Sequence, residues 1–77
     1  MQKQDEIKDP NSCWNKAKPT EKLFILLDRD KAAPNTVRDW CRRRCTMGLN
    51  NQFDPQISEA LNWADDVEKE QTIKELN

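Results

Sequence analysis

The side chains best suited to binding a ligand are concentrated in the run Arg42, Arg43 and Arg44, with Arg38 one helical turn earlier. Guanidinium groups bind phosphate through paired hydrogen bonds, so this pattern predicts a site for a phosphate-bearing ligand. Arg38 and Arg42 would share one face of a helix, where like charges repel unless an anion lies between them. The alternative is an exposed helix face whose charge is balanced by acidic residues elsewhere in the chain.

An aromatic side chain beside lysines could complete such a site, and Trp14 precedes Lys16 and Lys18. Its indole ring would stack on a base while the ammonium groups meet phosphate. Trp14 could instead fold back and cap a small core. Trp40 could also stack on a base, although its position on an apolar stripe fits a core residue. The predicted ligand-binding residues are therefore Trp14, Lys16, Arg38, Trp40, Arg42 and Arg43.

Most catalytic chemistry is excluded by composition. The chain has no His, which excludes Ser-His-Asp and Cys-His catalysis, and its single Gly excludes a glycine-rich phosphate loop. Cys41 and Cys45 have the spacing of a helical metal pair, but with only Cys13 left a zinc ion would need a carboxylate or water as well. Buried thiols explain that spacing more simply. We predict a protein that is not an enzyme, with no catalytic residues, no metal and no cofactor.

Size and composition predict one small domain that gains from self-association. The chain has 77 residues, of which 35% are hydrophobic and 35% charged, and a core of this size is marginal. A homo-oligomer would bury more surface. We find no secretory leader and no apolar segment of membrane-spanning length, and the odd number of cysteines suits a reducing compartment. We therefore expect a cytoplasmic protein without a membrane partner.

Charge is segregated along the chain although the net charge is only −1. Residues 14–45 carry nine basic and four acidic side chains, whereas residues 46–77 carry two basic and seven acidic ones. The two segments could complement each other within the fold or across subunits. Alternatively, the basic segment faces an anionic ligand.

Three helices are predicted to position these side chains in an all-α domain over residues 13–77, after a flexible or partly ordered arm over residues 1–12. The first would begin near Thr20 and contain the apolar run 23–27, which is rich in Leu and poor in β-branched residues. The second opens near Pro34 and ends at Gly48. Its apolar stripe includes Val37, Trp40, Cys41 and Cys45.

The third predicted helix has the strongest start signal, with Asp54 as N-cap and Pro55 at the first helical position. Its helical spacing of apolar residues continues beyond that start, and we expect the helix to run past Lys69. The apolar positions are Ile57, Ala60, Leu61, Ala64 and Val67.

The chain also resembles a group of small phage and prophage proteins with the pattern C-W-x-K-A, then R-D-x-x-A-P and V-R-x-W, then D-x-Q-I-x-E-A. Here these motifs begin at Cys13, Arg29, Val37 and Asp54, and the resemblance covers about residues 12–68. Relatives tend to have a proline ahead of the apolar run where this chain has Thr20-Glu21-Lys22, which bears on the start of the first helix. The resemblance implies a phage-encoded accessory protein in the bacterial cytoplasm that acts by binding.

Three functions follow as hypotheses. The first is sequestration of a nucleotide signal, such as a cyclic dinucleotide, which would counteract host defence. The second is inhibition of a host protein, in which an acidic third helix imitates nucleic acid; its acidic residues are Asp65, Asp66, Glu68 and Glu70. The third is nucleic-acid binding through the basic second helix, which a steep salt dependence would reveal.

Overall fold

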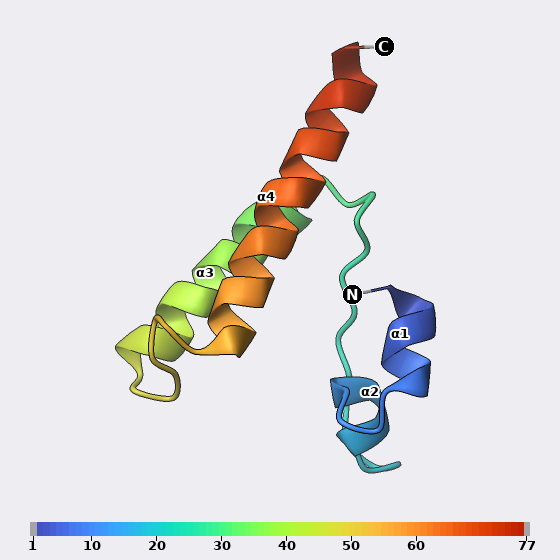
Figure 1. The fold of residues 1–77 in the computed structure, drawn as a ribbon, viewed down its shortest axis with the longest axis vertical. Helices are drawn as coiled ribbons and strands as arrows, with labels where there is room; N and C mark the ends of the chain where they lie inside the picture. The colour runs from blue at the N-terminus through green and yellow to red at the C-terminus, as the bar shows by residue number, and fades with distance from the viewer. Residues whose placement is uncertain (1, 77) are drawn as a thin grey trace.

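A computed structural model of the chain describes residues 2–76, and its regular structure is entirely helical (Figure 1). The helices are α1 (Lys3–Lys8), α2 (Cys13–Lys16), α3 (Ala33–Thr46) and α4 (Pro55–Leu76). No strand occurs within the described range. The predicted all-α class is confirmed, but two long and two short helices replace the expected three. Met1 and Asn77, the outer ends of the predicted arm and domain, lie outside the described residues.

Helices α3 and α4 form a hairpin, as the local signals of the second and third predicted helices indicate. Pro34 lies in the first turn of α3, where a missing N–H costs nothing. Gly48 has a φ of 75°, a left-handed conformation that glycine adopts without steric penalty, and its N–H bonds to Cys45 O at 3.1 Å. Pro55 begins α4, which runs well past Lys69. Both helix predictions are confirmed.

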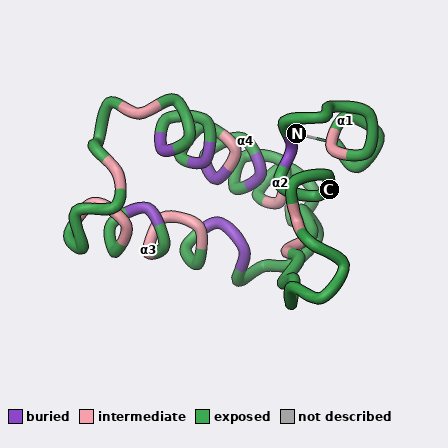
Figure 2. The backbone as a smooth tube through the Cα atoms, turned by 90° about the horizontal axis from the view of Figure 1, so that it is seen from below, coloured by how far each residue is buried: buried purple, intermediate pink, exposed green. Residues whose placement is uncertain are grey.

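The core lies along the contact between these two helices and is made largely of small side chains. Cys41, Ile57 and Ala60 form its centre, with Val37 and Cys45 packed against them. Figure 2 shows the buried positions on the facing sides of α3 and α4. Small side chains let two helices approach closely, but they bury little apolar surface. A second set of buried residues continues the contact toward the start of α3: Ala33, Pro34, Ala64 and Val67.

The N-terminal helices α1 and α2 pack against each other and make no helix–helix contact with α3 or α4. Ser12 caps α2 by accepting a hydrogen bond from the Asn15 N–H at 3.2 Å. The Asn15 side-chain amide donates to the carbonyls of Glu6, Ile7 and Asp9 at 3.0, 2.8 and 2.7 Å. The predicted arm, residues 1–12, thus includes a helix whose C-terminal end is tied to α2.

The predicted first helix is wrong. Residues 22–27 form neither helix nor strand, and they run as an extended chain between α2 and the start of α3 (Figure 1). A short isolated helix is marginal in water, and the apolar side chains of this segment are mostly exposed rather than packed on another helix.

Candidate functional site

Arg38 joins α3 to α4. Its guanidinium donates to Glu68 Oε2 at 2.6 Å and to Asp65 Oδ1 at 2.7 Å, and its side chain is 30% exposed. The hydrogen bond to Glu68 is the largest of the effects that raise the pKa of Arg38 above its usual range, and the hydrogen bond to Asp65 is the next largest. The charge of this arginine is therefore balanced within the hairpin, as the alternative reading of the basic run proposed. A phosphate at Arg38 would therefore compete with two carboxylates.

Arg42 and Arg43 lie on the outer face of α3 and share a single carboxylate. Arg43 Nε donates to Asp39 Oδ2 at 2.9 Å, and Arg42 pairs with the other oxygen. The hydrogen bond from Arg43 is the largest of the effects that lower the pKa of Asp39. Both guanidiniums are largely exposed, so this part of α3 presents two positive charges against one negative charge. It can attract an anion.

Trp40 lies one turn before Arg44 on α3 and is 40% exposed. The guanidinium of Arg44 lies 5.6 Å from the centre of the indole ring, within cation–π range. Arg44 Nε also donates to Asn50 Oδ1 at 2.6 Å, which connects α3 to the following loop. Trp40 is therefore neither a fully buried core residue nor an unoccupied stacking surface, because one ring face already carries a cation.

Trp14 and Lys16 are elsewhere in the molecule. Both are exposed on α2, which does not contact α3 (Figure 1). The structure therefore brings Arg42 and Arg43 together at Asp39, places Trp40 against Arg44, and turns Arg38 toward α4. It leaves Trp14 and Lys16 apart from all of them. Within one chain, the six predicted residues do not line a common pocket.

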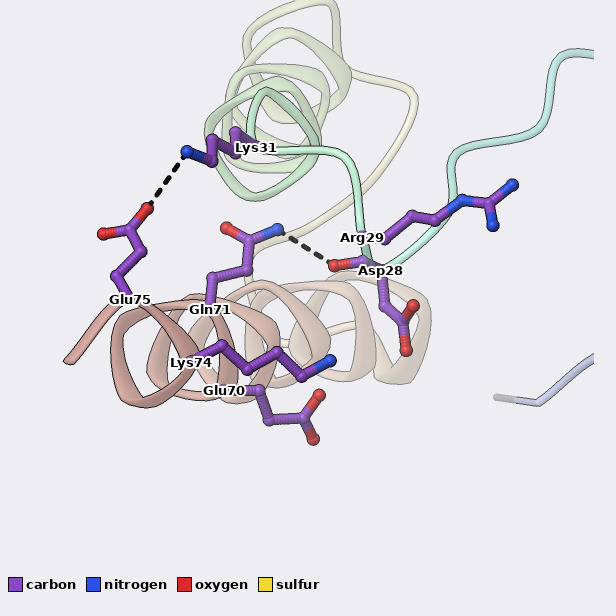
Figure 3. Close-up of a pocket in the computed structure, with 7 residues that line it drawn as sticks. All are labelled: Asp28, Arg29, Lys31, Glu70, Gln71, Lys74 and Glu75. Carbon is purple, nitrogen blue, oxygen red and sulfur yellow. Dashed lines mark hydrogen bonds and ion pairs between the residues drawn. The ribbon is translucent and has the colours of Figure 1, made fainter. Parts of the chain in front are cut away.

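The two principal surface hollows of the described residues lie along the C-terminal half of α4. One is lined by Glu68, Lys69, Thr72 and Ile73. Figure 3 shows the other, where the chain before α3 crosses α4. There the Gln71 amide donates to the carbonyls of Asp28 and Asp30 at 2.9 and 2.8 Å. Both hollows are shallow, and neither contains a residue of the predicted ligand set.

Among residues 2–76, the thiols belong to no cluster of three or more metal-binding side chains. Cys13 is exposed on α2, which does not contact α3. Cys41 is buried against α4, with its Sγ 4.0 Å from Ile57 O. Burial raises the pKa of the Cys41 thiol and keeps it protonated. Cys41 and Cys45 therefore act as small core residues, as the simpler reading of their spacing proposed.

Sequence reasoning did not predict the exposed apolar side chains of the loop between α3 and α4. Met47, Leu49 and Phe53 all lie at this end of the hairpin, and Phe53 is 82% exposed. We call these three residues the hairpin tip. Gly48 and the polar residues 50–52 predict a loop here, but they give no sign that its apolar members face outward.

The loop that carries the hairpin tip is held by its own hydrogen bonds. The Leu49 N–H donates to Arg44 O at 3.0 Å, and the Asn50 amide donates to Asp54 Oδ2 and Gln56 Oε1 at 3.0 and 3.1 Å. The Asn51 N–H also donates to Asp54 Oδ2, at 2.9 Å. Asp54, predicted as the N-cap of α4, thus directs its carboxylate into the loop and orders it.

A third exposed surface is the extended segment of residues 22–27. Phe24 is 86% exposed, and Leu23, Ile25 and Leu27 are each about half exposed or more. Exposed apolar surface on this scale is typical of a protein that associates with other molecules.

Comparison of the chain with known protein families, with curated proteins and with solved structures finds no match. Within the described residues, no helix is both long and apolar enough to cross a bilayer.

Proposed function

We propose that this protein is not an enzyme and that it binds and sequesters a nucleotide, such as a cyclic dinucleotide. The observation that carries the proposal is the arrangement of Arg42 and Arg43 around one carboxylate on the exposed face of α3. A phosphate placed between the guanidiniums would complete the charge balance that Asp39 alone leaves unfinished. Each arginine can offer two parallel N–H donors to the phosphate oxygens.

Trp40 supports the same site, because it precedes Arg43 by three residues on α3, a spacing at which helix side chains are neighbours. Small ligands bind tightly when most of their surface is buried, and the hollows found in one chain are too shallow for that. We therefore propose that the nucleotide lies between copies of the chain. A second copy would supply the remaining contacts, including Trp14 and Lys16, which face solvent in the single chain.

The test is thermal unfolding of the full chain against mononucleotides, cyclic dinucleotides and short single strands. A ligand at 100 times its Kd stabilises the folded state by ~2.7 kcal/mol, which is about 10 °C or more for a domain of this size. Arg42→Ala and Arg43→Ala should abolish that shift while leaving the ligand-free unfolding temperature nearly unchanged, because each leaves Asp39 one partner. Lys69→Ala, an exposed basic residue on α4, is the matched control.

Two results would contradict the proposal. One is a panel in which no nucleotide shifts the unfolding temperature. The other is a shift that both arginine variants retain in full. Stabilisation by single strands of any sequence, lost steeply with added salt, would instead support nucleic-acid binding by the same arginines.

A second candidate function, binding of a protein partner, is favoured by the hairpin tip. Exposed apolar residues on a loop ordered by its own hydrogen bonds lose little conformational entropy on binding. The exposed arginines of α3, Arg42 and Arg43, suit a partner whose apolar pocket has an acidic rim. The acidic face of α4 fits nucleic-acid mimicry less well, because Arg38 already engages Asp65 and Glu68. If the resemblance to phage proteins holds, this partner belongs to the bacterial host.

Phe53→Ser tests this second candidate in a pull-down from bacterial lysate. Ile73 is 59% exposed on α4, away from both the hairpin tip and the extended segment, so Ile73→Ser is the control for the loss of an exposed apolar side chain. Loss of a captured protein from Phe53→Ser alone would support a partner at the hairpin tip. Equal capture by both variants and by the unaltered chain would contradict it.

A further inference from the structure

The extended segment is antisymmetric in charge about Ile25. Residues 21–29 read Glu-Lys-Leu-Phe-Ile-Leu-Leu-Asp-Arg, so an acid and a base precede five apolar residues and an acid and a base follow them. Reversing the direction of the chain places a base where the acid was and an acid where the base was. A sequence with this property is complementary to a second copy of itself in the antiparallel direction.

The backbone of this segment is also available for pairing. Within residues 2–76, no N–H of residues 22–27 donates a hydrogen bond, and among their carbonyls only that of Leu27 accepts one, from the Asp30 N–H at 3.0 Å. The side chains of Lys22, Asp28 and Arg29 make none of the ion pairs in the described structure. In Figure 3, Arg29 points away from α4, and no hydrogen bond or ion pair is drawn to the carboxylate of Asp28. An exposed extended chain with free backbone groups is a ready site for strand addition.

We propose that residues 21–29 pair with the same residues of a second copy as an antiparallel two-stranded ribbon centred on Ile25. In this register Lys22 of each copy lies opposite Asp28 of the other, and Glu21 lies opposite Arg29. The five apolar residues between them meet only apolar residues. A two-fold rotation exchanges the two copies and leaves the pairing unchanged, so the assembly closes as a dimer with one interface.

The register is selected by charge. A slip of one residue in one direction would place Lys22 opposite Arg29, and in the other direction it would place Glu21 opposite Asp28. A parallel, in-register pair would place every charge opposite its own copy. Like charges facing each other across strands destabilise the pair, and opposite charges stabilise it. Among these arrangements, only the antiparallel register centred on Ile25 brings acids to bases throughout.

The segment is positioned for pairing by contacts at its C-terminal end. The Gln71 amide holds the carbonyls of Asp28 and Asp30, and Lys31 Nζ lies 3.5 Å from Glu75 Oε1 (Figure 3). A two-stranded ribbon is marginal in water on its own. A strand already tethered to α4 has less conformational entropy to lose, which favours pairing. The proposal does not depend on nucleotide binding, since it uses neither Arg42 nor Arg43.

The test is the molar mass of the full chain by sedimentation equilibrium, in the absence of nucleotide, over a range of concentrations. The unaltered chain should dimerise. Lys22→Glu and Asp28→Lys each place like charges at two symmetric positions, so each should weaken the dimer about ten-fold. An equimolar mixture of the two variants restores acid–base pairs at both positions and should form a heterodimer of near-normal affinity. Lys69→Glu, an equal charge change on α4, is the control.

Restoration in the mixture, or in the double variant Lys22→Glu/Asp28→Lys, is the expected result and would be peculiar to this register. A chain that stays monomeric at every concentration overturns the proposal. So does a dimer that neither single variant weakens, because another surface would then hold it. Amide hydrogen exchange adds a second readout: protection should alternate along residues 22–28 of the dimer, since every second residue of an antiparallel pair is hydrogen-bonded across the ribbon.

Discussion

Replacing Ile57 by alanine should remove a large part of the stability of the α3–α4 hairpin. Ile57 is 1% exposed and is the largest fully buried side chain of the described structure, packed with Cys41 and Ala60. Truncation of a buried isoleucine costs about 2–5 kcal/mol, and small neighbours cannot move enough to fill the space. We expect about 3 kcal/mol, against a total of about 4–11 kcal/mol for a chain of this length.

The assay is helix content followed by circular dichroism during thermal and urea unfolding. At 4–8 °C per kcal/mol for a domain of this size, the unfolding temperature should fall by about 15 °C. Ile73→Ala is the matched control, because it makes the same change in the same helix at a residue that is 59% exposed. It should shift stability by less than about 0.5 kcal/mol. Equal losses for the two variants would refute the placement of the core between α3 and α4.

The other predictions concern the loop and the thiols. Gly48→Ala should cost about 1 kcal/mol in urea unfolding through its positive φ alone, since an added Cβ at this position meets nothing within 4 Å; no loss would show that the turn relaxes. The hydrogen bond from the Asn51 N–H lowers the pKa of Asp54, so its stabilising effect is present at neutral pH and is lost as pH falls below about 4. Asp54→Asn should flatten that acid limb of the unfolding profile, and an unchanged profile would contradict the assignment. A thiol reagent should modify exposed Cys13 well before buried Cys41, and equal rates would contradict the packing of α3 on α4.

The limits of α3 and α4 could be predicted because the signals that set them act over a few residues. Pro34 and Pro55 favour the first turn of a helix wherever they occur, and Gly48 ends one by adopting a left-handed φ. The apolar spacing of each helix then indicates which face is buried. The same reasoning correctly assigned Cys41 and Cys45 to that face.

The segment of residues 22–27 was predicted wrongly because helix propensity is a weak preference that tertiary context overrides. Its leucines favour a helix, but in the structure Leu23 and Leu27 stay about half exposed, so packing does not stabilise a helix here. The short helix α1 was not predicted, because its own residues give little helix signal and contacts with α2 hold it. Its sequence is polar, and its C-terminal end is tied to α2 through the side chain of Asn15.

By itself, the sequence determined the helical class, the positions of the two long helices and the concentration of arginines on one of them, because these depend on residues close together in the chain. Only the tertiary structure decided how that charge is used. Arg38 meets Glu68, thirty positions away, while Arg42 and Arg43 stay outside and share Asp39. Which arginines are available to a ligand depends on how two helices pack, and a local pattern does not contain that information.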